Sequence, residues 1–104
     1  MKITLAPGDG IGPEIMGSVL QIFDKARVPL EYDLVAMGKE VVLAGDVTGI
    51  SETARRSVES TGILFKGPME TPKGSGHKSV NVTARKLWGV FANKRVYRTF
   101  SRVP

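Results

Sequence analysis

The sequence ITLAPGDGIGPEIM, residues 3–16, passes from a short apolar run through a glycine-rich turn into a helical pattern. Residues 3–6 have the character of a buried strand, and the Pro7-Gly8-Asp9-Gly10 turn predicts a tight loop after it. Pro13 suits the first turn of a helix, where its missing N–H is not needed. We therefore expect a strand, a loop and a helix in that order.

The expected helix begins at Pro13 and ends before Val28-Pro29, because the residue before a proline is pushed out of the helical region. Its apolar side chains recur at offsets of four, seven, eight and eleven, which predicts one face packed against a sheet. These side chains are Ile15, Val19, Ile22, Phe23 and Ala26.

The rest of the chain alternates between strand-like and helix-like stretches. Up to residue 65 we expect a strand over 30–35, a short helix over 39–44, a helix over 52–60 capped by Ser51, and a strand over 63–65. Beyond it we expect a loop over 71–78, a helix over 79–88 capped by Ser79, and strands over 90–92 and 95–100. Strands that alternate with helices predict a parallel sheet, and the fold class is therefore α/β.

The composition is that of one small globular domain. The 104 residues are 41% hydrophobic and 24% charged and include no cysteine, which excludes disulfides, zinc–thiolate sites and a thiol nucleophile. We find neither a run of about 20 apolar residues nor the apolar segment of a secretory signal. We expect a cytoplasmic protein, or one of the mitochondrial matrix in a eukaryote.

The formal net charge of +5 is concentrated in the last third of the chain. Residues 66–102 hold nine lysines and arginines against one acid, whereas residues 1–65 hold six bases and nine acids. Such a segment is compatible with nucleic acid, with an anionic small molecule or with no ligand at all. Tyr97, a lone aromatic in this segment, is a weak signal for nucleic acid.

The most informative polar residues lie on the helix expected over 79–88. With Ser79 as the cap, Asn81 lies in the first turn and Arg85 follows four residues later on the same face. An anion there would meet backbone N–H groups, a hydroxyl, an amide and a guanidinium, and Arg95 could add a second guanidinium. The alternative is a satisfied cap beside solvated arginines.

The glycine loop over 8–12 is not a dinucleotide fingerprint, because Pro13 stands where that motif needs its third glycine. The loop is either a plain connector or a surface on which a ligand lies against Ile11. The single histidine, His77, has no carboxylate or cysteine beside it in the sequence and predicts no metal site.

Three motifs carry a resemblance to a known family: GDGIGPE at 8–14, KGPMETP at 66–72, and SVNVTARK at 79–86 followed by FANKR at 91–95. In this order and spacing, the chain resembles the amino-terminal part of the isocitrate and isopropylmalate dehydrogenases. The Ser-x-Asn-x-x-x-Arg run resembles the isocitrate branch. Ala84 and Val96 depart from the leucine and proline usual in the family.

The resemblance implies that residues 1–104 are an incomplete amino-terminal portion of one larger dehydrogenase domain, with a mostly parallel sheet and flanking helices. The implied reaction, a step of the tricarboxylic acid cycle, is oxidative decarboxylation of isocitrate to 2-oxoglutarate with NAD or NADP and Mg²⁺ or Mn²⁺. By the same resemblance, isocitrate is bound by Ser79, Asn81, Arg85 and Arg95, and Thr71 and Ile11 lie beside the nicotinamide.

In the family, the proton-transferring and metal-binding residues lie beyond the matching segment. We therefore expect no catalytic or metal-binding residue within this chain, and no activity from the 104 residues alone. The resemblance also implies a homodimer with no nucleic acid or membrane partner. Two other classes stay open: an isopropylmalate or related 2-hydroxyacid dehydrogenase, and a non-catalytic basic binding module.

Overall fold

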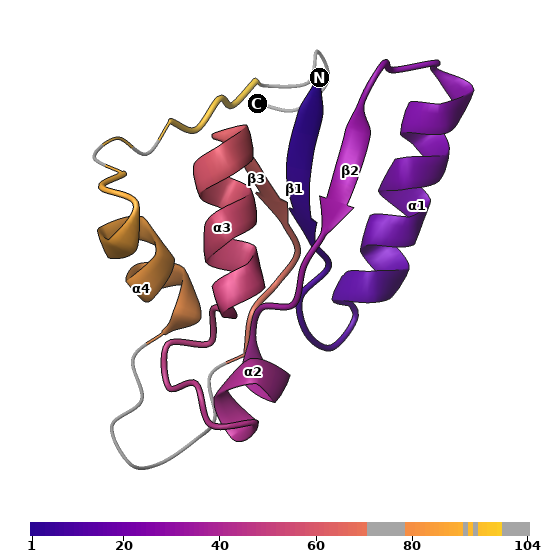
Figure 1. Ribbon diagram of the computed structural model, residues 1–104. Coiled ribbons are helices and arrows are strands. Elements are labelled where there is room, and N and C mark those ends of the chain that lie inside the picture. The colour runs from indigo at the N-terminus through magenta and orange to yellow at the C-terminus, as the bar shows by residue number, and fades with distance from the viewer. Residues whose placement is uncertain (71–78, 91, 93, 99–104) are drawn as a thin grey trace.

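The computed structural model describes residues 1–70, 79–90, 92 and 94–98 (Figure 1). Three parallel strands form one sheet in the order β2-β1-β3. The elements in chain order are β1 (Lys2–Ala6), α1 (Gly12–Lys25), β2 (Glu31–Leu34), α2 (Lys39–Leu43), α3 (Glu52–Thr61), β3 (Leu64–Lys66) and α4 (Val80–Leu87). The predicted α/β class, with parallel strands and flanking helices, is confirmed. No helix within the described ranges is long and apolar enough to cross a membrane.

Side-chain alternation along β1 gives the sheet two faces. Thr4 points toward α3, where its hydroxyl lies 2.7 Å from that of Ser57. Leu5, the next residue, pairs with Phe65, whose ring stacks on Phe23 of α1 with centroids 5.9 Å apart. Helices α1 and α3 therefore cover opposite faces of the sheet.

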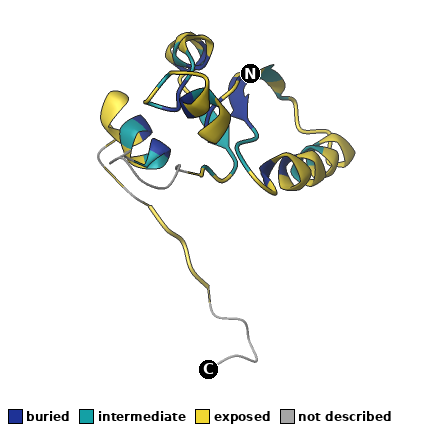
Figure 2. Cartoon of the chain, turned by 90° about the horizontal axis from the view of Figure 1, so that it is seen from below, coloured by how far each residue is buried: buried dark blue, intermediate teal, exposed yellow. Residues whose placement is uncertain are grey.

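Helix α1 turns a different face to the sheet from the one that the sequence predicted. Its first residue, Gly12, packs so closely that a Cβ there would lie 2.2 Å from the carbonyl oxygen of Pro7. This contact turns Gly12 and Met16 inward and leaves Ile15 and Ile22 46% and 64% exposed. Figure 2 shows that much of the surface of α1 is exposed. The predicted inner face was therefore wrong for Ile15, Ile22 and Ala26, which are exposed, and right for Val19 and Phe23, which are half-buried.

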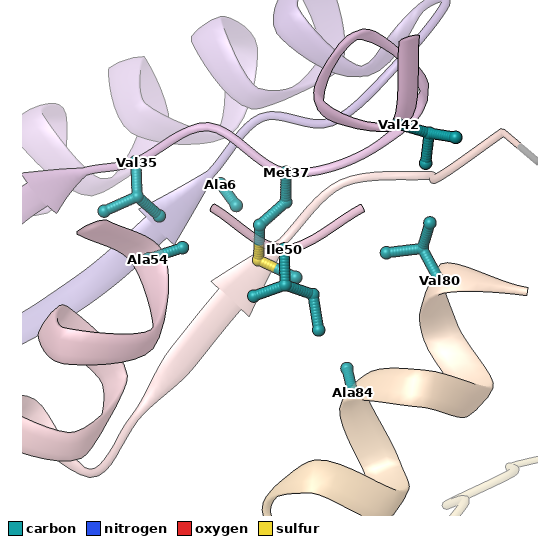
Figure 3. Packing of buried hydrophobic residues seen from close by; sticks show 8 residues of the cluster. All are labelled: Ala6, Val35, Met37, Val42, Ile50, Ala54, Val80 and Ala84. Atoms are coloured by element: carbon teal, nitrogen blue, oxygen red, sulfur yellow. The ribbon is translucent and has the colours of Figure 1, made fainter. Parts of the chain in front are cut away.

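The main hydrophobic core lies between the sheet, α3 and α4 (Figure 3). Its buried members are Ala6, Val35, Met37, Val42, Ile50, Ala54, Val80 and Ala84. A bridge between Met37 and Ile50 draws the segment between α2 and α3 into this core, where Ile50 is fully buried. Val80 is the first residue of α4, so the burial of its side chain in this core fixes where α4 begins.

The predicted helix caps are confirmed for α3 and only in part for α4. The backbone N–H of Ala54 donates to Ser51 Oγ at 3.2 Å, and Gly62 ends α3 in the left-handed region at φ +74°. Ser79 stands at the N-cap position of α4, but its hydroxyl makes no capping hydrogen bond.

The strands predicted over 90–92 and 95–100 are absent from the described residues of those stretches. Val90, Ala92 and Lys94–Arg98 have no regular secondary structure, and Val96 and Tyr97 are 75% and 80% exposed. Three cations among five residues leave the 94–98 segment little apolar surface whose burial would offset the entropy of ordering it. The loop predicted over 71–78 lies outside the described residues.

Two glycine-containing loops, one after β1 and one after β3, meet backbone to backbone at the carboxyl ends of these strands. The N–H of Asp9 donates to the carbonyl of Pro68 at 2.7 Å. A Cβ at Gly8 would lie 2.2 Å from that same carbonyl oxygen, and a Cβ at Gly67 would lie 2.0 Å from the carbonyl oxygen of Pro7. Only glycine permits this approach.

The contact at Gly67 can be tested by adding a single methyl group. We expect Gly67→Ala to lower the free energy of unfolding by about 1–3 kcal/mol, because the two loops must separate. Gly17→Ala is the control, since a Cβ there meets nothing within 4 Å, and it should stabilise α1 by about 0.5–1 kcal/mol. Urea unfolding followed by circular dichroism measures both. A Gly67→Ala chain as stable as the parent would contradict the contact.

Candidate functional site

The carboxyl ends of β1 and β3 are the natural place for a ligand in this sheet. The chain leaves β1 toward α1 on one face, and it leaves β3 toward α4, which shares its core with α3 on the other face. Ligands of open α/β sheets bind where neighbouring connections diverge in this way. The two glycine loops thus occupy the expected position for a binding site.

Ile11 lies at this edge, at the N-cap position of α1, and its side chain is 64% exposed. Glu70 approaches the same loop, because a Cβ at Gly10 would lie 3.1 Å from Glu70 Oε1. Thr71, which follows Glu70, lies outside the described residues. The structure therefore brings the segment that leads into Thr71 against the loop that carries Ile11.

A cavity of about 340 Å³ opens between α3, β3 and α4. Asn81 and Arg85 of α4 line it together with Lys66, the last residue of β3. The fold therefore brings two of the predicted ligands, Asn81 and Arg85, to one cavity. The other two, Ser79 and Arg95, are described residues that do not line it.

Two buried polar atoms along this cavity have no hydrogen-bond partner within the described part of the chain. They are Oδ1 of Asn81, which accepts hydrogen bonds, and Nε1 of Trp88, which donates them. An unpaired buried polar atom costs about 1–3 kcal/mol. A ligand that carries both a hydroxyl and a carboxylate offers a donor for the first atom and an acceptor for the second.

Lys66 is a candidate site residue that the sequence analysis did not single out. Partial burial, and secondarily the guanidinium of Arg85, lower the pKa of Lys66 below its ordinary value. Its ammonium donates to the carbonyl of Gly67 at 3.3 Å, and no salt bridge with a carboxylate holds it in the described residues. Its place as the first residue of KGPMETP, at the carboxyl end of a strand, was the available signal. A bound anion would offset the repulsion between Lys66 and Arg85.

No group of three or more histidine, cysteine, aspartate or glutamate side chains that could hold a metal ion occurs in the described ranges. His77 lies outside those ranges. The lining of the cavity is thus suited to binding and orienting an anionic small molecule, with two cations, one amide and apolar walls.

Relatives of this chain are found among curated proteins. Over 102 residues it is 43% identical to the Isocitrate dehydrogenase [NADP] of Thermus thermophilus, covering 98% of this chain and 21% of that protein. Over 93 residues it is 44% identical to the mitochondrial Isocitrate dehydrogenase [NAD] subunit 2 of Schizosaccharomyces pombe, covering 89% and 24%. The chain thus spans about a fifth of the length of the curated relatives it matches.

Solved structures agree with these relatives in fold. The TT0538 protein of Thermus thermophilus matches with a TM-score of 0.79 at 43% identity, over 83% of this chain and 17% of that one. The isocitrate dehydrogenase of Methylococcus capsulatus matches with a TM-score of 0.71 at 39% identity, over 81% and 24%. The sequence profile described as Isocitrate/isopropylmalate dehydrogenase matches residues 2–103. The matched range includes the motifs at 8–14, 66–72 and 79–86, and this chain belongs to the isocitrate/isopropylmalate dehydrogenase family.

Proposed function

We propose that this chain is the amino-terminal, substrate-holding part of an enzyme that oxidatively decarboxylates isocitrate to 2-oxoglutarate with NAD or NADP. The observation that carries the proposal is the cavity where Lys66 and Arg85 lie beside the unpartnered oxygen of Asn81. Isocitrate has carboxylates for the two cations and a hydroxyl for the amide oxygen. The curated relatives named above, all isocitrate dehydrogenases, favour this substrate over an alkylmalate.

In this proposal, the chain binds and orients the substrate. Arg85 offers a planar fork of donors to one carboxylate, and Lys66 offers a point charge to another. The oxygen of Asn81 accepts the hydrogen bond of the substrate hydroxyl and thereby fixes the carbon from which hydride leaves. Ser79 and Arg95 complete the carboxylate site in this proposal, on the strength of the family resemblance.

The nicotinamide supplies the hydride acceptor when it is bound. We assign Ile11 and Thr71 to its side of the site, since Ile11 is exposed beside the segment that leads into Thr71. The divalent metal that the family implies has no fitting set of ligands among the described residues. A homodimer in the cytoplasm or the mitochondrial matrix is part of the same proposal.

Activity can be measured in a chimera in which residues 1–104 replace the matching segment of the Thermus thermophilus relative, called the Thermus chimera below. Arg85→Lys keeps the charge but loses the planar fork, which should cost about 1.5–3 kcal/mol, or roughly tenfold to a hundredfold in kcat/KM for isocitrate. The control is Arg56→Lys, which alters an exposed pair with Glu52 on α3. Unchanged isocitrate kinetics in Arg85→Lys would contradict the assignment.

Ser79 needs its own test, because it precedes α4 without lining the cavity. A glutamate there would place negative charge where the proposal puts a substrate carboxylate, and like charges repel. We expect Ser79→Glu to raise the KM for isocitrate in the Thermus chimera by about tenfold or more, with an unchanged circular dichroism spectrum. Ser18→Glu on the exposed side of α1 is the control. A normal KM for Ser79→Glu would remove Ser79 from the site.

The 104-residue chain itself reports on the anion site through Lys66. We expect isocitrate to raise the pKa of Lys66, because a nearby carboxylate favours the ammonium form. Arg85→Gln should also raise the pKa of Lys66, since it removes a like charge, whereas Arg56→Gln should leave it unchanged. Titration of lysine ¹³Cε resonances measures these shifts. If isocitrate and Arg85→Gln both leave the pKa of Lys66 unmoved, the two cations do not share an anion.

A further inference from the structure

One carboxylate joins three separate segments at the edge of the sheet where Ile11 lies. Oδ2 of Asp9 accepts the backbone N–H of Lys39, the first residue of α2, at 2.9 Å. The same oxygen accepts the backbone N–H of Glu70 at 2.7 Å. Asp9 thus ties the loop after β1 both to the start of α2 and to the segment after β3.

The backbone of Asp9 and a neighbouring glycine strengthen this link. The N–H of Asp9 donates to Pro68, and its carbonyl accepts the N–H of Gly12 at 2.8 Å. A Cβ at Gly38 would lie 2.3 Å from Oδ2 of Asp9, so the carboxylate packs directly on the turn that precedes α2. The N–H, the carbonyl and the carboxylate of Asp9 therefore each hold a different part of the surrounding structure.

These contacts have a direct bearing on the two proposed nicotinamide residues. Ile11 follows Asp9 by two positions within one loop, and Thr71 follows Glu70 directly. The hydrogen bond between Asp9 and Glu70 therefore connects the loop of Ile11 to the residue that precedes Thr71. Hydrogen bonds to an ionised acceptor are stronger than neutral ones, which makes the carboxylate a stiff link.

We propose that Asp9 is a positioning residue for the nicotinamide cofactor: its carboxylate sets the distance between the loop of Ile11 and the segment that leads into Thr71. The inference rests on the proposed function, because that proposal supplies the cofactor. Asp9 does not line the cavity of Lys66, Asn81 and Arg85. Its loss therefore acts on cofactor binding and leaves isocitrate binding nearly intact.

The test compares two variants of Asp9 in the Thermus chimera. Asp9→Ala removes both acceptor bonds and should raise the KM for the cofactor by about tenfold or more, because the two segments are then no longer held at one spacing and misplaced positioning groups are costly. The KM for isocitrate should change by less than about twofold. Asp9→Asn keeps an acceptor oxygen and should recover much of the cofactor affinity. Asp24→Ala, on an exposed side of α1, is the control.

The outcomes separate this inference from the proposed function. If Asp9→Ala lowers only the melting temperature, or raises both KM values equally, Asp9 is a structural residue and the inference is wrong. If the unmutated chimera does not oxidise isocitrate, the proposed function fails. The fluorescence of bound NADPH then measures cofactor affinity directly, and equal affinities of the parent and Asp9→Ala would overturn the role of Asp9.

Discussion

The close approach of two backbones, in the loops after β1 and β3, is the constraint on which the site depends. A Cβ at Gly8 would fall 2.2 Å from the carbonyl oxygen of Pro68, and a Cβ at Gly67 would fall 2.0 Å from that of Pro7, so each meets the other loop. This approach sets the direction in which α1 leaves the sheet and places Lys66 and Asp9 at one edge. Adding a side chain at Gly8 or Gly67 would separate the loops, and the two halves of the proposed site would then move apart.

A buried polar network holds α3 against the central strand of the sheet. Thr4, fully buried in the central strand, contacts the hydroxyls of Ser57 and Thr61, each at 2.7 Å, and Ser57 donates to Asp33 on β2. Buried hydroxyls are costly unless they are paired, and this pairing requires one position of α3 over the sheet. Because Val58 follows Ser57 and lines the cavity, the network also fixes one wall of that cavity.

Elements whose ends carry a glycine, a proline or a capping residue could be predicted from the sequence to within a residue or two, as α3 illustrates with Ser51 and Gly62. The inner face of α1 could not, because apolar residues occur on two sides of the helix and only the contact of Gly12 with the preceding loop selects one. The role of Lys66 was missed for a related reason: burial and the nearby guanidinium that lower its pKa come from elements distant in sequence. The strand propensity of residues 94–98 likewise did not suffice to predict their structure, because a strand is stabilised mainly by packing against neighbouring strands.

The net charge of +5 is compatible with nucleic acid, with a small anion or with no ligand. The positions of the basic side chains in the fold bear on these alternatives. The side chains of Lys94–Arg98 are exposed and do not line the cavity of Lys66. Lys66 is half-buried, and with Arg85, whose side chain is exposed, it lines one cavity of about 340 Å³, within the size range of small-molecule sites. Partial burial of one cation beside another costs stability, which a small domain has little of. A bound small anion would offset that cost, which favours the small-anion alternative that the proposed function uses.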